Sequence, residues 1–172
     1  LAGVEQALRE AGMDLLLYNF AQVDARKRVF QQKKLVGKVD GLIVISLPPT
    51  DREFEQILGL GIPVSLLGVP DSRCSCVSID DIKGGESAAK HLVEMGHRDI
   101  AIMSGIEEQA FNFQVARQRK EGFLNILKEN GIEFDDSNEI FADFDSHTSE
   151  LAMDEFLRRK KLPTAIFCES DE

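Results

Sequence analysis

The chain has 172 residues and a formal net charge of −10, with 43% hydrophobic and 7% aromatic residues. This length suits one large or two small domains, and the composition is that of an ordinary α/β protein. No apolar run approaches the roughly 20 residues that a membrane helix needs. The acidic residues are concentrated late in the chain: residues 1–98 carry 12 Lys and Arg against 13 Asp and Glu, and residues 99–172 carry 8 against 17. Nucleic-acid binding relies on clustered Lys and Arg, so this segment is not expected to bind DNA with its own surface.

Apolar residues at helical spacing alternate with short apolar runs along the first half of the chain. Gly12 and Gly61 follow two of the helical patterns as end signals, and Asp51 is the expected cap of the second. Helices are predicted at 4–11, 24–38 and 51–60, and strands at 14–20, 40–46, 62–68 and 76–80.

The same alternation continues in the second half. Gly96 ends one helix and Gly131 another, and Asp145 or Ser146 begins the last helix, which has the cations Arg158 to Lys161 at its C-terminus. Helices are predicted at 88–95, 115–130 and 146–161, and strands at 99–105, 139–144 and 164–168.

The predicted strands are continuous apolar runs rather than alternating ones. This pattern is typical of strands that are buried on both faces, as in parallel sheets covered by helices. Alternation with helices predicts a doubly wound α/β architecture. Such sheets bind ligands in the loops that follow the carboxyl ends of their strands.

Signatures of catalysis or metal binding are weak. The sequence has no dinucleotide-binding or phosphate-binding glycine loop and no nucleophile elbow. The three cysteines suggest neither a disulfide framework nor a zinc site, and free thiols favour a reducing, cytoplasmic compartment. Asp80 and Asp81 precede a helix, where a cap is expected first and a metal ligand is the alternative. We therefore expect no enzyme activity, no cofactor and no metal.

The segment VARQRKEGF, residues 115–123, places Arg117, Arg119 and Lys120 in the first turns of a helix. Cations are disfavoured there by the helix dipole. Two interpretations stay open: the cations pair with acidic residues (Glu107, Glu108 or Glu121), or they anchor a polar ligand through the donor fork of arginine. Residues two apart do not share a helix face, so only one arginine should point towards a ligand.

Several segments together resemble the ligand-sensing domain of LacI/GalR-family bacterial transcription regulators: VDGLIVIS, IPVSLLG, SIDDIKGGESAAKHLVEMGHRDIAIMSG, ARQRKEGF and PTAIFCESDE. The resemblance implies a type I periplasmic-binding-protein-like fold of two doubly wound, parallel-sheet subdomains, 1–98 and 99–172, that close over a small polar effector. It further implies a homodimer and a helix-turn-helix domain, outside this chain, that binds operator DNA. The first strand and the rest of the second subdomain are also expected to lie outside it.

The resemblance also implies a set of effector-binding residues. Arg119 matches the anchoring arginine of the family and Arg117 its neighbour, while Phe144 matches a stacking aromatic, although a core position is an equal alternative. The expected ligand-binding residues are Ser46, Arg117, Arg119, Phe144, Ser170 and Asp171. The chain departs from the family at two places. Gly68 occupies a position where the family often has an aspartate, and the loop at 106–114, which carries Phe111 and Phe113, is longer than is common.

The resemblance implies a cytoplasmic, ligand-responsive transcription regulator. Arg119 and Phe144 suit a sugar, a sugar phosphate or a purine, and a sugar or sugar derivative is the expected effector. One alternative is a periplasmic sugar-binding protein of the same fold, which would need a secretory signal upstream. The other is an enzyme on a related α/β scaffold, which would show turnover.

Overall fold

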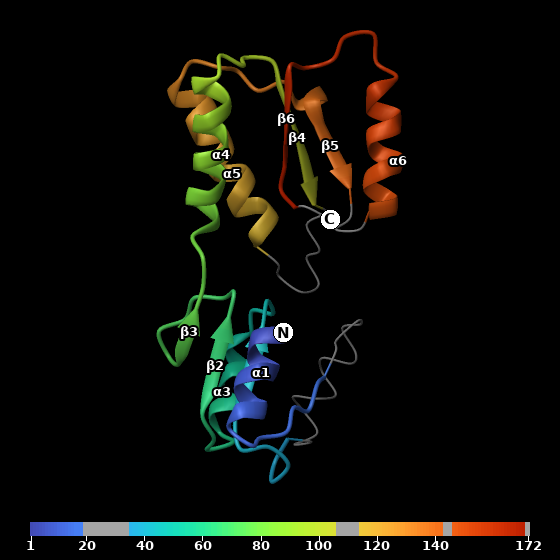
Figure 1. The fold of residues 1–172 in the computed structure, drawn as a ribbon. Helices are drawn as coiled ribbons and strands as arrows, with labels where there is room; N and C mark the ends of the chain where they lie inside the picture. The colour runs from blue at the N-terminus through green and yellow to red at the C-terminus, as the bar shows by residue number, and fades with distance from the viewer. Residues whose placement is uncertain (19–34, 106–113, 143–145, 171–172) are drawn as a thin grey trace. The chain divides into compact units, whose positions relative to one another are not determined.

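The computed structural model describes residues 1–18, 35–105, 114–142 and 146–170 (Figure 1). The chain divides into two compact units, unit 1 (Leu1–Val77) and unit 2 (Ser78–Glu172). Each contains a sheet of parallel strands, so the predicted α/β class with parallel sheets is confirmed.

Unit 1 contains a sheet of order β1-β2-β3 in which all described neighbours are parallel. The apolar runs predicted at 40–46 and 62–68 form its first two strands. Its strands are β1 (Leu42–Ile45), β2 (Val64–Leu67) and β3 (Ser75–Val77).

Helix α3 (Asp51–Leu58) covers one face of this sheet with Phe54 and Ile57, which are fully buried. Its cap is Thr50, not Asp51 as expected. The Thr50 hydroxyl accepts a hydrogen bond from the Glu53 N–H at 3.3 Å, and the Glu53 carboxylate accepts one from the Thr50 N–H at 2.8 Å. This reciprocal capping box satisfies two helix-end donors at once, which a single Asp51 side chain would not do.

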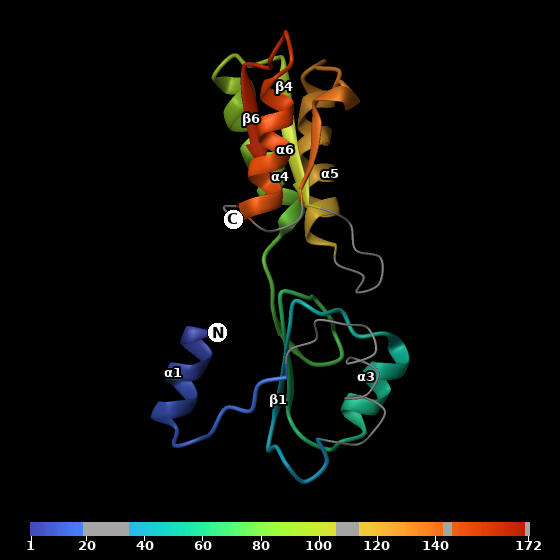
Figure 2. The ribbon, with the colours of Figure 1, turned by 90° about the vertical axis from the view of Figure 1, so that its right-hand side faces the viewer.

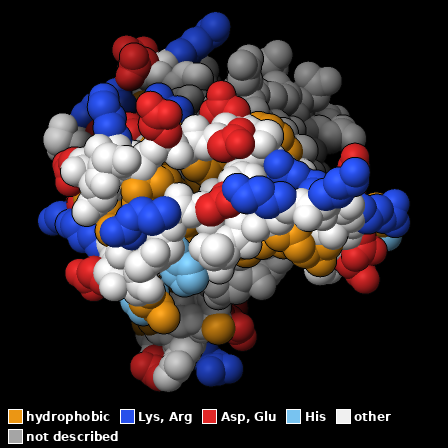
Figure 3. All heavy atoms as spheres, turned by 90° about the horizontal axis from the view of Figure 1, so that it is seen from above, with side chains coloured by type: hydrophobic (Ala, Val, Ile, Leu, Met, Phe, Trp, Pro, Cys, Tyr) orange, Lys and Arg blue, Asp and Glu red, His pale blue; other side chains and the backbone are white. Residues whose placement is uncertain are grey.

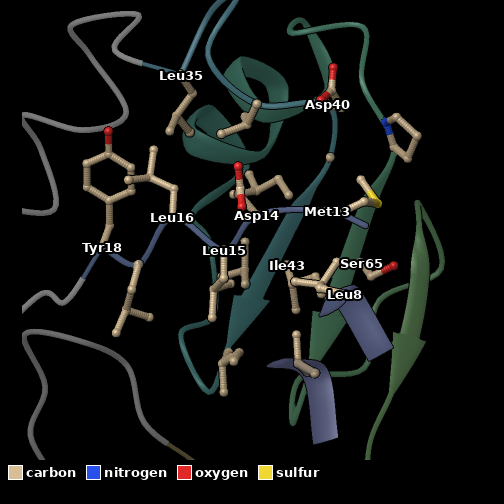
Figure 4. Close-up of a pocket in the computed structure, with 18 of the residues that line it drawn as sticks. Leu8, Met13, Asp14, Leu15, Leu16, Tyr18, Leu35, Asp40, Ile43 and Ser65 are labelled. Atoms are coloured by element: carbon tan, nitrogen blue, oxygen red, sulfur yellow. The ribbon is translucent and has the colours of Figure 1, made fainter. Parts of the chain in front are cut away.

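Helix α1 (Ala2–Glu10) forms as predicted but buries none of its residues. The strand predicted at 14–20 is wrong for its described part, because residues 14–18 form no strand. A strand needs a neighbour that supplies ladder hydrogen bonds, and a cavity lies between this segment and β1 (Figure 4). Most of the helix predicted at 24–38 lies outside the described residues, and residues 35–38 form a turn.

Unit 2 has a parallel sheet of order β5-β4-β6 with helices on both faces (Figures 1 and 2). One face packs against α4 and α5 through a core that includes Ile100, Ile102 and Phe123, and the other packs against α6 through Phe156. Its elements are α4 (Asp81–Glu94), β4 (Ile100–Gly105), α5 (Val115–Glu129), β5 (Glu139–Ala142), α6 (Ser146–Leu157) and β6 (Ala165–Cys168). The predicted strand and helix order of this half is confirmed.

The two compact units divide between Val77 and Ser78, which is earlier than the subdomain boundary expected at 98/99. The physical reason is α4, whose Ala89 is fully buried in the core that α5 and β4 share. This helix therefore packs as part of unit 2.

At the amino ends of the unit 2 strands, charged side chains of both signs are interspersed with other residues (Figure 3).

Helix α6 ends at Leu157, so the cations 158–161 follow the helix rather than occupying its last turn. Lys161 pairs with Asp99 at 2.8 Å. His97 contacts the hydroxyl of Thr164 at 2.9 Å through Nδ1, and its backbone N–H donates to the Leu92 carbonyl at the end of α4. The Arg98 side chain donates to the Val93 carbonyl.

Candidate functional site

The arginine-rich segment begins helix α5 as predicted. The helix starts after Gln114, whose side chain makes no capping hydrogen bond, and its first turn contains no acidic residue. Arg117 is exposed, whereas the side chain of Arg119 is only 27% exposed. As expected from their spacing, only one of the two arginines turns inward.

Arg119 is held by two acceptors at the carboxyl end of the unit 2 sheet. Its Nε donates to Asp81 Oδ1 at 2.8 Å, and its Nη1 donates to the backbone carbonyl of Glu169. Among the described residues its carboxylate partner is therefore Asp81 rather than Glu121. Glu107 and Glu108, the other expected partners, lie outside the described residues. The guanidinium is thus oriented by groups from α4 and from the residue that follows β6.

Asp80 and Asp81 divide two roles between them. The Asp80 side chain caps α4 by accepting from the Lys83 N–H at 3.0 Å, which confirms the expected cap. Asp81 occupies the first helical turn, is 7% exposed and pairs with Arg119. A buried carboxylate is stable when it is paired, so Asp81 and Arg119 constrain each other's position.

Two glycines bring α4 and α5 into the close contact that makes this pair possible. A Cβ atom at Gly85 would lie 1.9 Å from the carbonyl oxygen of Arg119, and one at Gly122 would lie 2.0 Å from the carbonyl oxygen of Ile82. Neither position can carry a side chain unless the helices separate. Gly85 therefore fixes the backbone of Arg119 against the first turns of α4.

Glu169 is a buried acid at the same edge of the sheet. It follows β6, its side chain is buried, and its Oε2 accepts a hydrogen bond from the Gly105 N–H at 3.1 Å. Burial raises the pKa of Glu169 to about 7, although the Gly105 N–H and the cations of Lys120 and Arg119 act in the opposite direction. Lys120 itself pairs with Glu139. Glu169 was not among the expected effector-binding residues; an acid directly after an apolar strand was the available signal.

Ser46 lies at the carboxyl end of β1 in unit 1, with an exposed side chain and a φ of 53°, a left-handed conformation that is uncommon for serine. Such strain is found preferentially at functional sites. Gly68 follows β2 with a φ of 81°, and a Cβ there would lie 3.3 Å from Ser46 Oγ. Glycine at position 68, where the family often has an aspartate, thus leaves room beside Ser46.

The remaining expected residues are only partly described. Ser170 is half-buried and directly follows Glu169, so it lies at the same edge as Arg119. Phe144, Asp171, Phe111 and Phe113 lie outside the described residues, so their predicted roles stay predictions. In the described ranges no three His, Cys, Asp or Glu side chains are grouped as a metal site, and no helix is long and apolar enough to cross a membrane.

A cavity of about 770 Å³ lies within unit 1, and Ile45 and Leu47, the neighbours of Ser46, are among its lining residues. Leu8 of α1, Leu15, Leu16 and Ile43 of β1 are among the side chains that surround it (Figure 4). Most of its lining side chains are aliphatic, and Asp14, Tyr18, Lys38 and Asp40 are among the others. The cavity borders β1, which lies at an edge of the described sheet.

Comparison with known proteins places this architecture in a family. The family model described as periplasmic binding proteins and sugar-binding domain of LacI family matches residues 1–172. The repressor PurR of Actinobacillus pleuropneumoniae is 29% identical over 170 residues, which cover 98% of this chain and 49% of that protein. The regulator CelR of Thermobifida fusca is 31% identical, with 98% and 49% covered.

A solved structure described as a complex of the transcriptional regulator CelR with cellobiose superposes with a TM-score of 0.74 at 31% identity, covering 96% of this chain and 50% of that one. The chain spans about half the length of the curated relatives it matches. The match of the family model along the whole chain and the parallel sheets agree with each other. The chain belongs to the family of periplasmic binding proteins and LacI-family sugar-binding domains.

Proposed function

We propose that this chain is the ligand-sensing part of a bacterial transcription regulator and that Arg119 anchors a small polar effector, a sugar or sugar derivative. Binding of the effector shifts the equilibrium between arrangements of the protein and thereby changes its affinity for operator DNA. Ser46, Arg117, Phe144, Ser170 and Asp171 complete the proposed set of effector contacts.

The observation that carries this proposal is the half-buried guanidinium of Arg119 at the carboxyl end of the unit 2 sheet. Its bonds to Asp81 and to the Glu169 carbonyl use Nε and one N–H of Nη1, and its Nη2 makes no hydrogen bond to a described residue. A preoriented arginine with donors to spare at the ligand-binding edge of a parallel sheet suits an oxygen-rich ligand.

The names of the similar proteins favour a regulator over a periplasmic solute-binding protein, because PurR and CelR are described as transcriptional regulators. The net charge of −10 agrees with DNA contact through a separate helix-turn-helix domain. We propose that this domain lies in the part of the protein outside this chain and that the regulator acts as a cytoplasmic homodimer.

The domain organisation is part of the same proposal. β1 lies at an edge of the described sheet and borders the aliphatic cavity of unit 1. An additional parallel strand beside β1 would fill this space and supply the missing ladder hydrogen bonds. We propose that residues outside this chain supply it.

The test is a thermal-shift panel of sugars, sugar derivatives, purines and amino acids on the full-length protein. A ligand present at about 100 times its dissociation constant adds ~2.7 kcal/mol to the free energy of unfolding. We expect a sugar or sugar derivative to stabilise the protein and to change its affinity for operator DNA. The absence of any hit from a folded sample would contradict the proposal.

Two variants locate the site. Arg119→Ala also leaves the buried Asp81 carboxylate unpaired, which costs about 3–5 kcal/mol, so a loss of binding could reflect unfolding. Arg119→Lys keeps a cation for Asp81 but loses the planar donor fork, and we expect at least about tenfold weaker effector binding with the fold retained. Arg158→Ala, at an exposed cation beyond α6, is the control and should bind as the parent does. Unchanged affinity of Arg119→Lys would place the anchor elsewhere.

A further inference from the structure

Two buried oxygen atoms at the carboxyl edge of the unit 2 sheet have no hydrogen-bond partner. They are Ser104 Oγ and Glu169 Oε1, on side chains that are each 4% exposed. Met103 of β4 is in register with Cys168 of β6, so Ser104 and Glu169 are the next residues on neighbouring strands. Because side chains alternate along a strand, both lie on the face of Ile102 and Phe167, which α5 covers.

A buried polar atom that lacks a partner costs about 1–3 kcal/mol, which a ligand group can recover by bonding to it. Glu169 is next to Arg119, because the Arg119 guanidinium donates to the Glu169 carbonyl, and Ser104 lies beside Glu169 on the neighbouring strand. A hydroxyl group that enters this edge can donate to Glu169 Oε1 and accept from the Ser104 hydroxyl. A phosphate or carboxylate group offers only acceptors and cannot satisfy an ionised Glu169.

The charged side chains around Arg119 also favour an uncharged ligand over an anion. Among the described residues, the cations that act on Glu169 are Arg119 and Lys120, and the carboxyl groups paired with them are Asp81 and Glu139. Asp81 pairs with Arg119 and Glu139 with Lys120. With every group ionised, the cluster therefore carries an excess negative charge that belongs to Glu169, and it repels a second anion.

We propose that the effector is an uncharged, hydroxyl-rich molecule, that Glu169 and Ser104 contact it beside Arg119, and that Glu169 excludes anionic effectors. This inference rests on the proposed function of the chain as an effector sensor. Since both oxygens are shielded from solvent, it requires a small opening of this edge when the effector binds.

The protonation state of Glu169 makes the inference testable by pH. Burial raises its pKa to about 7, while the Gly105 N–H, Lys120 and Arg119 lower it and Glu139 raises it. As the pH falls through about 7 the acid takes up a proton, and its repulsion of anions decreases. As the pH rises through about 7 it ionises, and the preference for an uncharged ligand should increase.

The experiment measures binding of matched neutral and anionic ligands to the full-length protein by calorimetry between pH 6 and 8. The pairs are cellobiose with cellobionate and glucose with glucuronate, whose carboxylates stay ionised throughout this pH range. For the pair that binds, we expect the neutral member to be at least about tenfold tighter at pH 8, with the ratio falling as the pH is lowered.

Glu169→Gln is the decisive variant because its amide oxygen still accepts from the Gly105 N–H, while its charge is absent at every pH. This variant should reduce the ratio of the anionic to the neutral dissociation constant to a few-fold and remove the pH dependence of that ratio. Ser104→Ala should weaken the neutral ligand several-fold and leave the pH dependence in place. Glu133→Gln, at an exposed acid, is the control and should change neither.

The outcomes separate the two proposals. Tighter binding of an anionic member, or an unchanged ratio in Glu169→Gln, overturns this inference while the sensor function stands. If neither these pairs nor the wider panel binds, the sensor function fails and the inference fails with it. If Glu169→Gln does not fold, the pH profile of the parent decides: a flat ratio between pH 6 and 8 overturns the role of Glu169.

Discussion

The sheets of the two units are built from the same kind of apolar parallel strand, but their surroundings differ. In unit 2, α4 and α5 cover one face and α6 covers the other, so that Ala101 and Ile102 are both fully buried. In unit 1, α3 covers one face, while Ile43 on β1 remains 43% exposed and Leu16 is 53% exposed. Parallel strands are stable when both faces are covered. The comparison indicates that, among the residues that the structure describes, unit 2 has the more complete core.

The residues that we propose as effector contacts also differ between the two units. In unit 2, Arg119 is fixed by Asp81, by the Glu169 carbonyl and by a close helix crossing. In unit 1, Ser46 is an exposed residue at the end of a strand that borders a cavity. Of these two residues, Arg119 is therefore the one with the more closely fixed side chain.

The largest expected effect comes from the helix crossing of unit 2. Gly85→Ala would place a methyl group 1.9 Å from the Arg119 carbonyl oxygen. The helices must separate to admit it, and we expect a loss of about 3 kcal/mol or more in the free energy of unfolding, measured by urea denaturation. The displacement of Arg119 should also weaken effector binding.

Gly84→Ala is the matched control, because a Cβ at Gly84 meets no atom within 4 Å. This variant should be neutral or more stable by about 0.5–1 kcal/mol, since alanine favours a helix more than glycine does. Equal effects of the two substitutions would show that the close crossing does not hold unit 2 together.

The sequence predicted most strands of the fold, but it did not predict the helix crossing at these glycines. Apolar runs predicted β1, β2, β4, β5 and β6 because a buried parallel strand has a clear local pattern. The same pattern failed at residues 14–18, because a strand also needs a neighbour that no local rule supplies.

The candidate site was predictable only in part for a similar reason. The unusual position of cations at the start of α5 identified Arg119, but its partner Asp81 is 38 positions away. Their contact depends on the helix crossing at Gly85 and Gly122, which appeared in the sequence only as separate glycines. The burial of Glu169 likewise follows from the packing of α5 against the sheet, so its raised pKa has no signature in the local sequence.

A smaller effect is expected in hydrogen exchange of the 172-residue chain. The backbone amides of β1 and β2 should exchange at least about tenfold faster than those of β4, because opening free energies follow local burial. Mass spectrometry of peptides from the two sheets measures this directly. Equal protection in both sheets would contradict the conclusion that unit 1 is less completely packed. In the full-length protein the difference should narrow if a further strand covers the cavity.

The smallest expected effect concerns the strained serine of unit 1. Ser46→Gly should raise the free energy of unfolding of unit 1 by about 0.5–1 kcal/mol, because glycine adopts a φ of 53° without the steric cost that serine bears. The same substitution in the middle of β2, Ser65→Gly, should lower it by about 0.5–1 kcal/mol, since glycine weakens a strand interior. Urea denaturation followed by a probe in unit 1 compares the two. A loss of effector affinity in Ser46→Gly, despite its higher stability, would indicate that the serine is retained for its hydroxyl group. If Ser46→Gly instead lowers the free energy of unfolding, as Ser65→Gly should, the left-handed backbone at Ser46 is not strained and this prediction is wrong.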